Sequence, residues 1–338
     1  MFQGSFLAAT LAGKTTLGLP FYLPHGANVQ IMDEGVIRFG PRDPQSSPLH
    51  LVISCGVHGN ETAPVELVER LIAALLSGEL KPRARVMFVL GNVAALRAGT
   101  RFVQQDMNRL FCRIPEASDD DESRRATMLE MHLMRFFFSR AIQDDKPRLH
   151  YDLHTAIHGS QIEKFAIYPR PNEGQHFQPA AVARLARGGV AAVLLQTSTA
   201  PTFSYFSSRH CGATAFTVEL GRAAPFGQNA ALDLSQMEAH LRALIGGEVP
   251  MDDSAPASMQ VFRVSREIIK RSEAFELFID AKTDNFTPLI QGQPLARDGE
   301  HTWTVEEAGA RIIFFPNPDV AVGQRAGLVI VPTESYAR

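Results

Sequence analysis

A histidine and a glutamate stand three residues apart in a Gly-Val-His-Gly-Asn-Glu run that directly follows an apolar segment. His58 and Glu61 come after residues 51–55, so a strand is expected to end and a helix to begin around them. Imidazole nitrogen and carboxylate oxygen are both ligands that zinc accepts. His154 ends a second strand-like run, residues 149–153, and completes a set of three ligands. Three protein ligands with a fourth position open are typical of a catalytic zinc site.

On its own, the His-x-x-Glu spacing is a weak signal, because it arises often by chance. The alternative is that His58 lies in an ordinary loop and that Glu61 is a surface carboxylate in a first helical turn. The positive end of a helix would favour an ionised Glu61 in either case. The metal hypothesis therefore needs a fold that brings His154 to the same place.

Glu219 is a carboxylate at the end of an otherwise buried segment, residues 213–218. A carboxylate at such a place is costly unless it is paired or functional. Partial burial raises the pKa of a glutamate toward neutrality, which suits general acid–base catalysis. A strand-end glutamate held in an ion pair is the plainer alternative, and the sequence leaves it open.

Three arginines, Arg101, Arg109 and Arg209, are candidates for binding an anionic substrate. A guanidinium can bind a carboxylate through two parallel hydrogen bonds and keeps its charge. One of them beside a metal ion could also stabilise an oxyanion. Taken singly, each is better explained as a solvated surface residue. Asp106 is a candidate to hold a ligand histidine from behind, or else it caps a local turn.

Other chemistry finds less support. His150 shares a strand face with His154 and is expected to be a packed histidine rather than a ligand. No serine lies in a Gly-x-Ser-x-Gly context, so a serine hydrolase is poorly supported. The chain also contains neither a P-loop nor a Gly-x-Gly-x-x-Gly motif, which argues against a nucleotide site of either kind.

The segments that carry the candidates alternate between strands and helices over residues 48–250. This alternation predicts an α/β domain with a mostly parallel sheet. In such sheets, sites gather at the C-terminal ends of strands, where His58, His154 and Glu219 fall. Asn60 is a plausible N-cap of the helix that follows. Strands are predicted over residues 49–55, 85–90, 149–153, 190–195 and 213–219, and helices over residues 61–76, 128–141 and 180–186.

The composition changes near residues 246–258, where Gly, Pro, Asp and Ser predict a linker. Beyond it, short alternating segments predict a small all-β domain. We therefore divide the chain into a catalytic domain, residues 1–250, and a β-rich C-terminal domain, residues 251–338. Residues 1–47 are expected to form a β-rich extension of the first domain, with a hairpin over residues 29–39.

Charge and cysteine content limit the binding partners and the cellular compartment that are expected. A formal net charge of −3 over 338 residues gives no basic field to attract nucleic acid or an anionic membrane. Three widely spaced cysteines form neither a CxxC pair nor a disulfide framework, which favours a reducing compartment. No stretch reaches membrane-spanning length, and the apolar residues 6–12 lack the basic segment of a signal peptide. The expected location is the cytoplasm, and a homo-oligomer is left open.

With these residues in place, the sequence resembles the succinylglutamate desuccinylase and aspartoacylase family of zinc amidohydrolases. The resemblance covers almost the whole chain and implies a zinc-carboxypeptidase-like mixed sheet flanked by helices. It rests on Arg101 and on the motifs at residues 56–64 (GVHGNETAP), 91–92 (GN), 106–111 (DMNRLF), 152–156 (DLHTA), 219–221 (ELG), 225–229 (PFGQN), 284–286 (DNF) and 315–318 (FPNP).

The resemblance also implies roles for the candidates. His58, Glu61 and His154 match the ligands of one zinc ion per chain. Glu219 matches the glutamate that takes a proton from water and passes it to the leaving amine. Arg101 matches the residue that helps to polarise the scissile carbonyl.

The remaining matches concern the substrate. Asn108 and Arg109 match substrate-binding positions, and Arg209 stands ten residues before Glu219, as a substrate-binding arginine does in the aspartoacylase branch. The implied reaction is hydrolysis of N-succinyl-L-glutamate to succinate and L-glutamate, the last step of arginine catabolism by the succinyltransferase pathway. Two alternatives stay open: a zinc hydrolase of another acyl amino acid such as N-acetylaspartate, and a non-catalytic anion-binding protein with a structural metal.

Overall fold

The structure is a computed structural model that describes residues 5–15, 17–114, 116, 120–139, 146–156, 159–248, 258–280, 282–313 and 318–334. Within these residues, twelve strands form one large sheet and three strands form a small second sheet. The strands of the large sheet are β1 (Phe21–Tyr22), β2 (Asn28–Asp33), β3 (Val36–Gly40), β4 (His50–Cys55), β5 (Arg85–Leu90), β6 (Arg148–Ala156), β7 (Lys164–Tyr168), β8 (Ala192–Leu195), β9 (Thr214–Arg222), β10 (Gln260–Ile269), β14 (Arg311–Ile313) and β15 (Arg325–Pro332). The strands of the small sheet are β11 (Phe275–Leu277), β12 (Pro294–Asp298) and β13 (His301–Thr304).

Helices accompany the strands of the first three quarters of the chain, and within the described residues none is long and apolar enough to cross a membrane. The α-helices are α1 (Phe6–Leu11), α2 (Thr62–Ser77), α3 (Val93–Ala98), α4 (Asp121–Phe137), α5 (Pro179–Ala186), α6 (Phe203–Cys211) and α7 (Ser235–Ile245). Two short 3-10 helices are η1 (Pro44–Ser46) and η2 (Met107–Arg109).

The large sheet has the order β1-β2-β3-β5-β4-β6-β9-β7-β8-β10-β15-β14. Its centre is parallel: β4 pairs in parallel with both β5 and β6, and β6 pairs in parallel with β9. β7 runs antiparallel to β9, and β1 to β3 form an antiparallel extension at the other side. The predicted mixed α/β sheet with flanking helices is confirmed. The parallel centre also places the C-terminal ends of β4, β6 and β9 along one edge.

Both faces of the central strands are covered, which explains the nearly continuous apolar character of β4. Leu51 and Ile53 belong to the hydrophobic core that contains α2 and α7, whereas Val52 belongs to the core that contains α4 and α6. Strands buried on both faces are expected to be apolar at every position rather than at alternate ones. A polar side chain in the centre of this sheet is therefore an exception that needs a polar partner or a function.

Several helix boundaries differ from those predicted. α2 begins one residue later than expected, with Glu61 rather than Asn60 at the N-cap position. α4 begins at Asp121 instead of residue 128, because the side chain of Asp120 accepts a hydrogen bond from the Ser123 amide and caps it. α6 was not predicted, although Thr202 caps its start in the same way.

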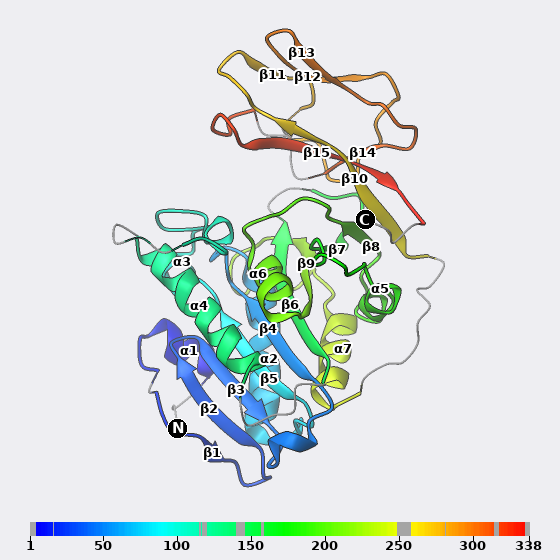
Figure 1. Cartoon of the computed structure of the whole chain (residues 1–338). Helices are drawn as coiled ribbons and strands as arrows, with labels where there is room; N and C mark the ends of the chain where they lie inside the picture. Colours follow the sequence, from blue (N-terminus) through cyan, green and yellow to red (C-terminus); the bar gives the residue numbers. More distant parts are fainter. Residues whose placement is uncertain are drawn as a thin grey trace.

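The β-rich C-terminal part is confirmed for the described residues, but it is not a separate sheet. β10 pairs in parallel with β8 and antiparallel with β15, so the large sheet continues into this part of the chain. Figure 1 shows these yellow to red strands at one end of the molecule and the blue N-terminal strands at the other. The predicted boundary between residues 250 and 251 lies outside the described residues and stays a prediction. Most of the motif at residues 315–318 also lies outside them.

The loop between β4 and α2 is pressed against α3. A Cβ atom on Gly59 would lie 2.1 Å from the carbonyl carbon of Ala95 and 2.3 Å from its oxygen. The Gly59 amide also donates a hydrogen bond of 3.1 Å to the Arg101 carbonyl oxygen. Only glycine permits this approach, because the backbone of α3 leaves no room for a side chain.

The variant Gly59→Ala is therefore expected to destabilise the protein by about 1–3 kcal/mol or more, since a backbone segment must shift to make room. Thermal or urea denaturation would measure the loss. The matched control is Gly18→Ala, because a Cβ atom on Gly18 meets no heavy atom within 4 Å. Equal stability of the two variants would contradict the close approach.

Candidate metal centre

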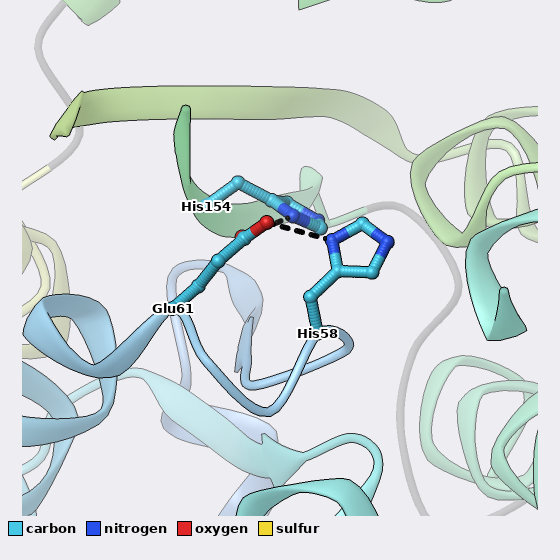
Figure 2. A group of neighbouring side chains, drawn as sticks. All are labelled: His58, Glu61 and His154. Atoms are coloured by element: carbon cyan, nitrogen blue, oxygen red, sulfur yellow. Dashed lines mark hydrogen bonds and ion pairs between the residues drawn. The ribbon is translucent and has the colours of Figure 1, made fainter. Parts of the chain in front are cut away.

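Three buried side chains meet at the C-terminal edge of the sheet. His58 lies in the loop after β4, Glu61 is the residue just before α2, and His154 lies near the end of β6. Their exposed fractions are 3%, 2% and 2%. One potential ligand atom of each lies within 4.8 Å of the other two, and Figure 2 shows the three side chains converging. The fold thus brings together the three residues that the sequence suggested as zinc ligands.

The Glu61 carboxylate lies between the two imidazole rings. Its Oε1 is 2.8 Å from Nδ1 of His58, and its Oε2 is 2.9 Å from Nδ1 of His154. Burial alone would raise the pKa of Glu61, but the charges of the two histidines outweigh it and hold that pKa well below its usual value. Glu61 is therefore an ionised carboxylate in the interior of the protein.

The outer nitrogen of each ring faces a second carboxylate. Nε2 of His58 lies 2.9 Å from Oδ1 of Asp106, and Nε2 of His154 lies 3.0 Å from Oδ2 of Asp152. Burial raises the pKa of both aspartates, but other groups together bring it below its usual value. These groups are His58, Arg109 and Arg101 around Asp106, and His154, His150 and Ser54 around Asp152. An ionised carboxylate only accepts hydrogen bonds, so each ring carries a proton on Nε2. This orients Nδ1 of both rings toward Glu61.

Asp152 is held in turn by a buried polar chain that runs down the sheet. Oγ of Ser54 donates a hydrogen bond of 2.5 Å to Oδ1 of Asp152 and lies 2.8 Å from Nε2 of His150. Burial lowers the pKa of His150 to about 4, so this ring is neutral near pH 7. His150 packs edge-on against Phe203, as a packed histidine is expected to do. The contact between Asp152 and His154 was not predicted from the sequence, although strand alternation puts both side chains on the same face of the sheet.

The donor set fits a divalent metal ion. Nδ1 of His58 is buried and makes no hydrogen bond within the described residues, although it lies near a carboxylate. Two imidazole nitrogens backed by carboxylates, together with one glutamate, are a common way of holding zinc. Burial alone would lower the pKa of His154, but Asp152 and Glu61 outweigh it and hold that pKa well above its usual value. His154 therefore carries a second proton, on Nδ1, in the metal-free protein, and a metal ion would compete with this proton for Nδ1.

Glu219 lies beside the three residues, because β9 pairs with β6 in a register that sets Glu219 opposite His154. Parallel neighbours in register point to the same face of a sheet. Oε2 of Glu219 is buried and finds no hydrogen-bond partner in the described part of the chain. Burial raises the pKa of Glu219 to about 7, and the charge of Glu61 adds to this effect. A carboxyl group with this pKa can accept and return a proton near neutral pH.

The candidate arginines are placed differently from one another. Arg101 reaches the centre, where it donates a hydrogen bond of 3.0 Å to Oε1 of Glu61. Its side chain is 31% exposed, so it also faces solvent. The exposed side chain of Arg109 donates to the carbonyl oxygen of Asn108 at 3.0 Å. Arg209 is exposed on α6 and donates to Oδ1 of Asn172 at 3.1 Å, so its described contact is not with the centre.

Asn108 is buried, and its side chain has a structural contact. Oδ1 of Asn108 accepts a hydrogen bond of 3.1 Å from the Phe203 amide, which is the first residue of α6. This contact ties the segment after Asp106 to the helix that carries Arg209. Among the other histidines, His210 is exposed and stacks on Phe206, and His158 lies outside the described residues.

Comparison with known proteins gives one consistent result. The model of the succinylglutamate desuccinylase/aspartoacylase catalytic domain matches residues 48–245, and that of the AstE/AspA barrel-sandwich hybrid domain matches residues 257–333. A succinylglutamate desuccinylase of Pseudomonas putida is 47% identical over 330 residues, which cover 97% of both chains.

Solved structures agree with these matches. The succinylglutamate desuccinylase of Chromobacterium violaceum has a TM-score of 0.85 and 37% identity, over 98% of both chains. That of Vibrio parahaemolyticus has a TM-score of 0.88 and 33% identity, over 98% of this chain and 96% of the other. Both domains of the fold are therefore shared with proteins of that name.

A pKa of about 7 for Glu219 makes the stability of the metal-free protein depend on pH. The unfolded chain releases this proton near pH 4.3, so ionisation of Glu219 opposes folding from there up to about pH 7. Between pH 4 and pH 8, we expect the wild type to lose on the order of 3 kcal/mol relative to Glu219→Gln. Urea denaturation in the presence of a chelator would measure it.

The exposed Glu300→Gln variant is the control and should show no such trend. A stability difference between Glu219→Gln and the wild type that stays constant with pH would contradict the raised pKa. So would a difference that changes in the opposite direction.

Proposed function

The chain belongs to the succinylglutamate desuccinylase/aspartoacylase family, and from this premise we propose that it hydrolyses N-succinyl-L-glutamate to succinate and L-glutamate with one zinc ion per chain. The observation that carries the proposal is the buried His-Glu-His group beside Oε2 of Glu219, which has no hydrogen-bond partner among the described residues. Full-length relatives that are 44–47% identical bear the name of this enzyme and support the substrate. The chain is accordingly a hydrolase.

His58, Glu61 and His154 would hold the metal ion, through Nδ1 of both rings and the carboxylate. When bound, zinc acidifies water and polarises a carbonyl group. Asp106 and Asp152 keep the two rings in the orientation that presents Nδ1. Ligand sets of this kind accept several divalent ions, and the choice of zinc rests on the two imidazoles and on the family.

Glu219 would act on the proton. Its carboxylate takes a proton from the attacking water and returns it to the nitrogen of the departing glutamate. The pKa of about 7 suits both steps, because the group accepts and releases a proton with little driving force either way. Arg101, at the edge of the centre and partly open to solvent, would share the negative charge that develops on the carbonyl oxygen.

Asn108, Arg109 and Arg209 are proposed to bind the substrate. N-succinylglutamate has three carboxylates, and guanidinium groups recognise carboxylates with two parallel hydrogen bonds. The exposed Arg109 and Arg209 are accessible to such a ligand. For Arg209 the proposal requires exchange of its contact with Asn172 for the substrate. Asn108 would assist substrate binding indirectly, because its hydrogen bond to the Phe203 amide joins the segment after Asp106 to α6.

The wider setting remains a proposal as well. Cys55 and Cys211 are buried free thiols and Cys112 is an exposed free thiol, which favours a reducing compartment such as the cytoplasm. There the enzyme would complete arginine catabolism by the succinyltransferase pathway. An aspartoacylase-like activity is the second candidate, because the family includes both branches. A non-catalytic binding protein is disfavoured, since a buried carboxylate oxygen that finds no partner in the described part of the chain, with a raised pKa beside the candidate ligands, suits catalysis better than stability.

Purified protein is expected to release succinate and glutamate from N-succinylglutamate, to lose this activity with a chelator and to regain it with zinc. Chromatographic detection of both products would measure it. N-acetylaspartate and N-acetylglutamate should be hydrolysed far more slowly under the same conditions. Faster cleavage of N-acetylaspartate would favour the aspartoacylase-like alternative, and zinc binding without any cleavage would favour the binding protein.

Glu219→Gln is expected to keep stoichiometric zinc and to lose about 10²–10⁴-fold in kcat, the usual contribution of general acid–base catalysis. Metal analysis together with steady-state kinetics would show both effects. Glu163→Gln, a carboxylate on the segment before β7, serves as the control and should keep normal turnover. Near-normal turnover by Glu219→Gln would rule out the proposed proton transfer.

A further inference from the structure

A short loop, residues 102–105, joins the two residues that support the ligand set from outside. Arg101 at one end contacts Glu61, and Asp106 at the other contacts His58. The loop itself packs poorly: its two apolar side chains, Phe102 and Val103, are 39% and 53% exposed. Apolar burial therefore contributes little to its conformation.

Glu122, in the first turn of α4, holds this loop. The residue is 3% exposed, and its carboxylate accepts four hydrogen bonds. Oε1 accepts from the Val103 amide at 2.8 Å and from Nδ2 of Asn92 at 2.5 Å. Oε2 accepts from the amides of Gln104 and Gln105 at 2.7 and 2.6 Å. Three consecutive backbone N–H groups of the loop thus point at one buried carboxylate.

The physical setting favours a carboxylate at this position over any other group. A carboxylate has room for about four hydrogen-bond donors, and here four N–H groups fill it. N–H donors bind an ionised oxygen about twice as strongly as a neutral one. The N-terminal end of α4 adds a favourable field for negative charge. An amide in place of the carboxylate would bring an NH₂ group against backbone donors.

Asn92 extends the same arrangement to the metal loop. Its Oδ1 accepts a hydrogen bond of 3.0 Å from the Ala95 amide and caps the start of α3. Ala95 is the residue whose backbone presses against Gly59, between the two ligands of the loop after β4. Glu122 therefore stands behind the ligand set along two routes, through the loop at residues 102–105 and through α3.

We propose that Glu122 is a positioning residue of the metal centre, which fixes the loop at residues 102–105 so that Arg101 and Asp106 stay in contact with Glu61 and His58. None of the four donors that bond to Glu122 in the described part of the chain belongs to the ligand set, so Glu122 would act on it through the loop. The inference rests on the proposed metal centre for its functional consequence. Its structural premise, the hold of Glu122 on three loop amides, does not.

The test compares Glu122→Gln with the wild type in two assays on the full chain. Hydrogen exchange of the amides of Val103, Gln104 and Gln105 in the metal-free protein should become about tenfold faster or more, because their charged acceptor is lost. Zinc affinity, measured by competition with a chromogenic chelator, should weaken about tenfold, within the range seen when groups behind metal ligands are removed. With N-succinylglutamate as the substrate, kcat of Glu122→Gln should fall by a larger factor than the factor by which KM rises.

Glu130→Gln is the matched control, since Glu130 lies on the same helix and accepts from one backbone amide, that of Cys112 at 2.7 Å. It should leave the exchange of residues 103–105 and the zinc affinity unchanged. Glu122→Asp keeps the charge on a shorter side chain and should fall between Glu122→Gln and the wild type, which also covers the case that Glu122→Gln fails to fold.

Two results would overturn the inference. One is unchanged exchange at residues 103–105 in a folded Glu122 variant, and the other is faster exchange with wild-type zinc affinity. A general loss of stability in Glu122→Gln would also contradict the proposal: it would lower the unfolding temperature and speed exchange throughout the chain rather than selectively at residues 103–105. A wrong substrate would appear separately, as failure of the wild type to cleave N-succinylglutamate while both Glu122 effects persist.

Discussion

The orientation of two imidazole rings is the constraint on which the centre depends. Asp106 and Asp152 accept hydrogen bonds from Nε2–H of His58 and His154, and this leaves Nδ1 of both rings directed at Glu61. A flip of either ring would place the Cδ2–H group where a ligand nitrogen is needed, and a shift of the proton to Nδ1 would place an N–H group there. The position of a carboxylate behind each ring is therefore as important as the position of the ligands themselves.

The electrostatic balance of the centre follows from the same carboxylates. Glu61, Asp106 and Asp152 all have a pKa below its usual value, so three negative charges lie close together in the interior. Arg101 offsets part of this charge from the solvent side. In the metal-free protein, a proton on His154 offsets more, and a doubly charged ion would replace that proton. Burial and the charge of Glu61 raise the pKa of Glu219 to about 7 against the opposing charges of His154, His58 and Arg101, so Glu219 can exchange protons near neutral pH.

The sheet supplies these positions from distant parts of the chain. Parallel pairing in register sets Glu219 opposite His154 and Asp152 opposite Ser54, so one face of the sheet carries the proposed proton-transfer group, a proposed metal ligand and the aspartate that supports it. The loop after β4 contributes the other two ligands because glycine lets it pass under α3. Since the groups come from β6, from β9 and from the loop after β4, the site forms only when these parts of the parallel centre have come together.

The sequence predicted the parts of the site that obey local rules. His58, Glu61, His154 and Glu219 could be found because strands of a parallel sheet end at a common edge and because polar residues interrupt apolar runs there. Asp152 was within reach of the same reasoning, through strand alternation.

Other contacts depend on tertiary structure that no local pattern reveals. The Glu122 carboxylate meets a loop some twenty residues away, and β10 pairs with β8 across a segment of more than sixty residues. Arg209 was proposed from its distance to Glu219 along the chain, but α6, which turns it toward Asn172, was not predicted.

The most direct measurement is anomalous diffraction at the zinc absorption edge from crystals of the full chain grown with zinc. One peak per chain is expected, in contact with Nδ1 of His58, Nδ1 of His154 and the Glu61 carboxylate, with both Nε2 atoms still on Asp106 and Asp152. A peak bound through Nε2 of either ring, or a peak elsewhere with none at this centre, would contradict the proposed site.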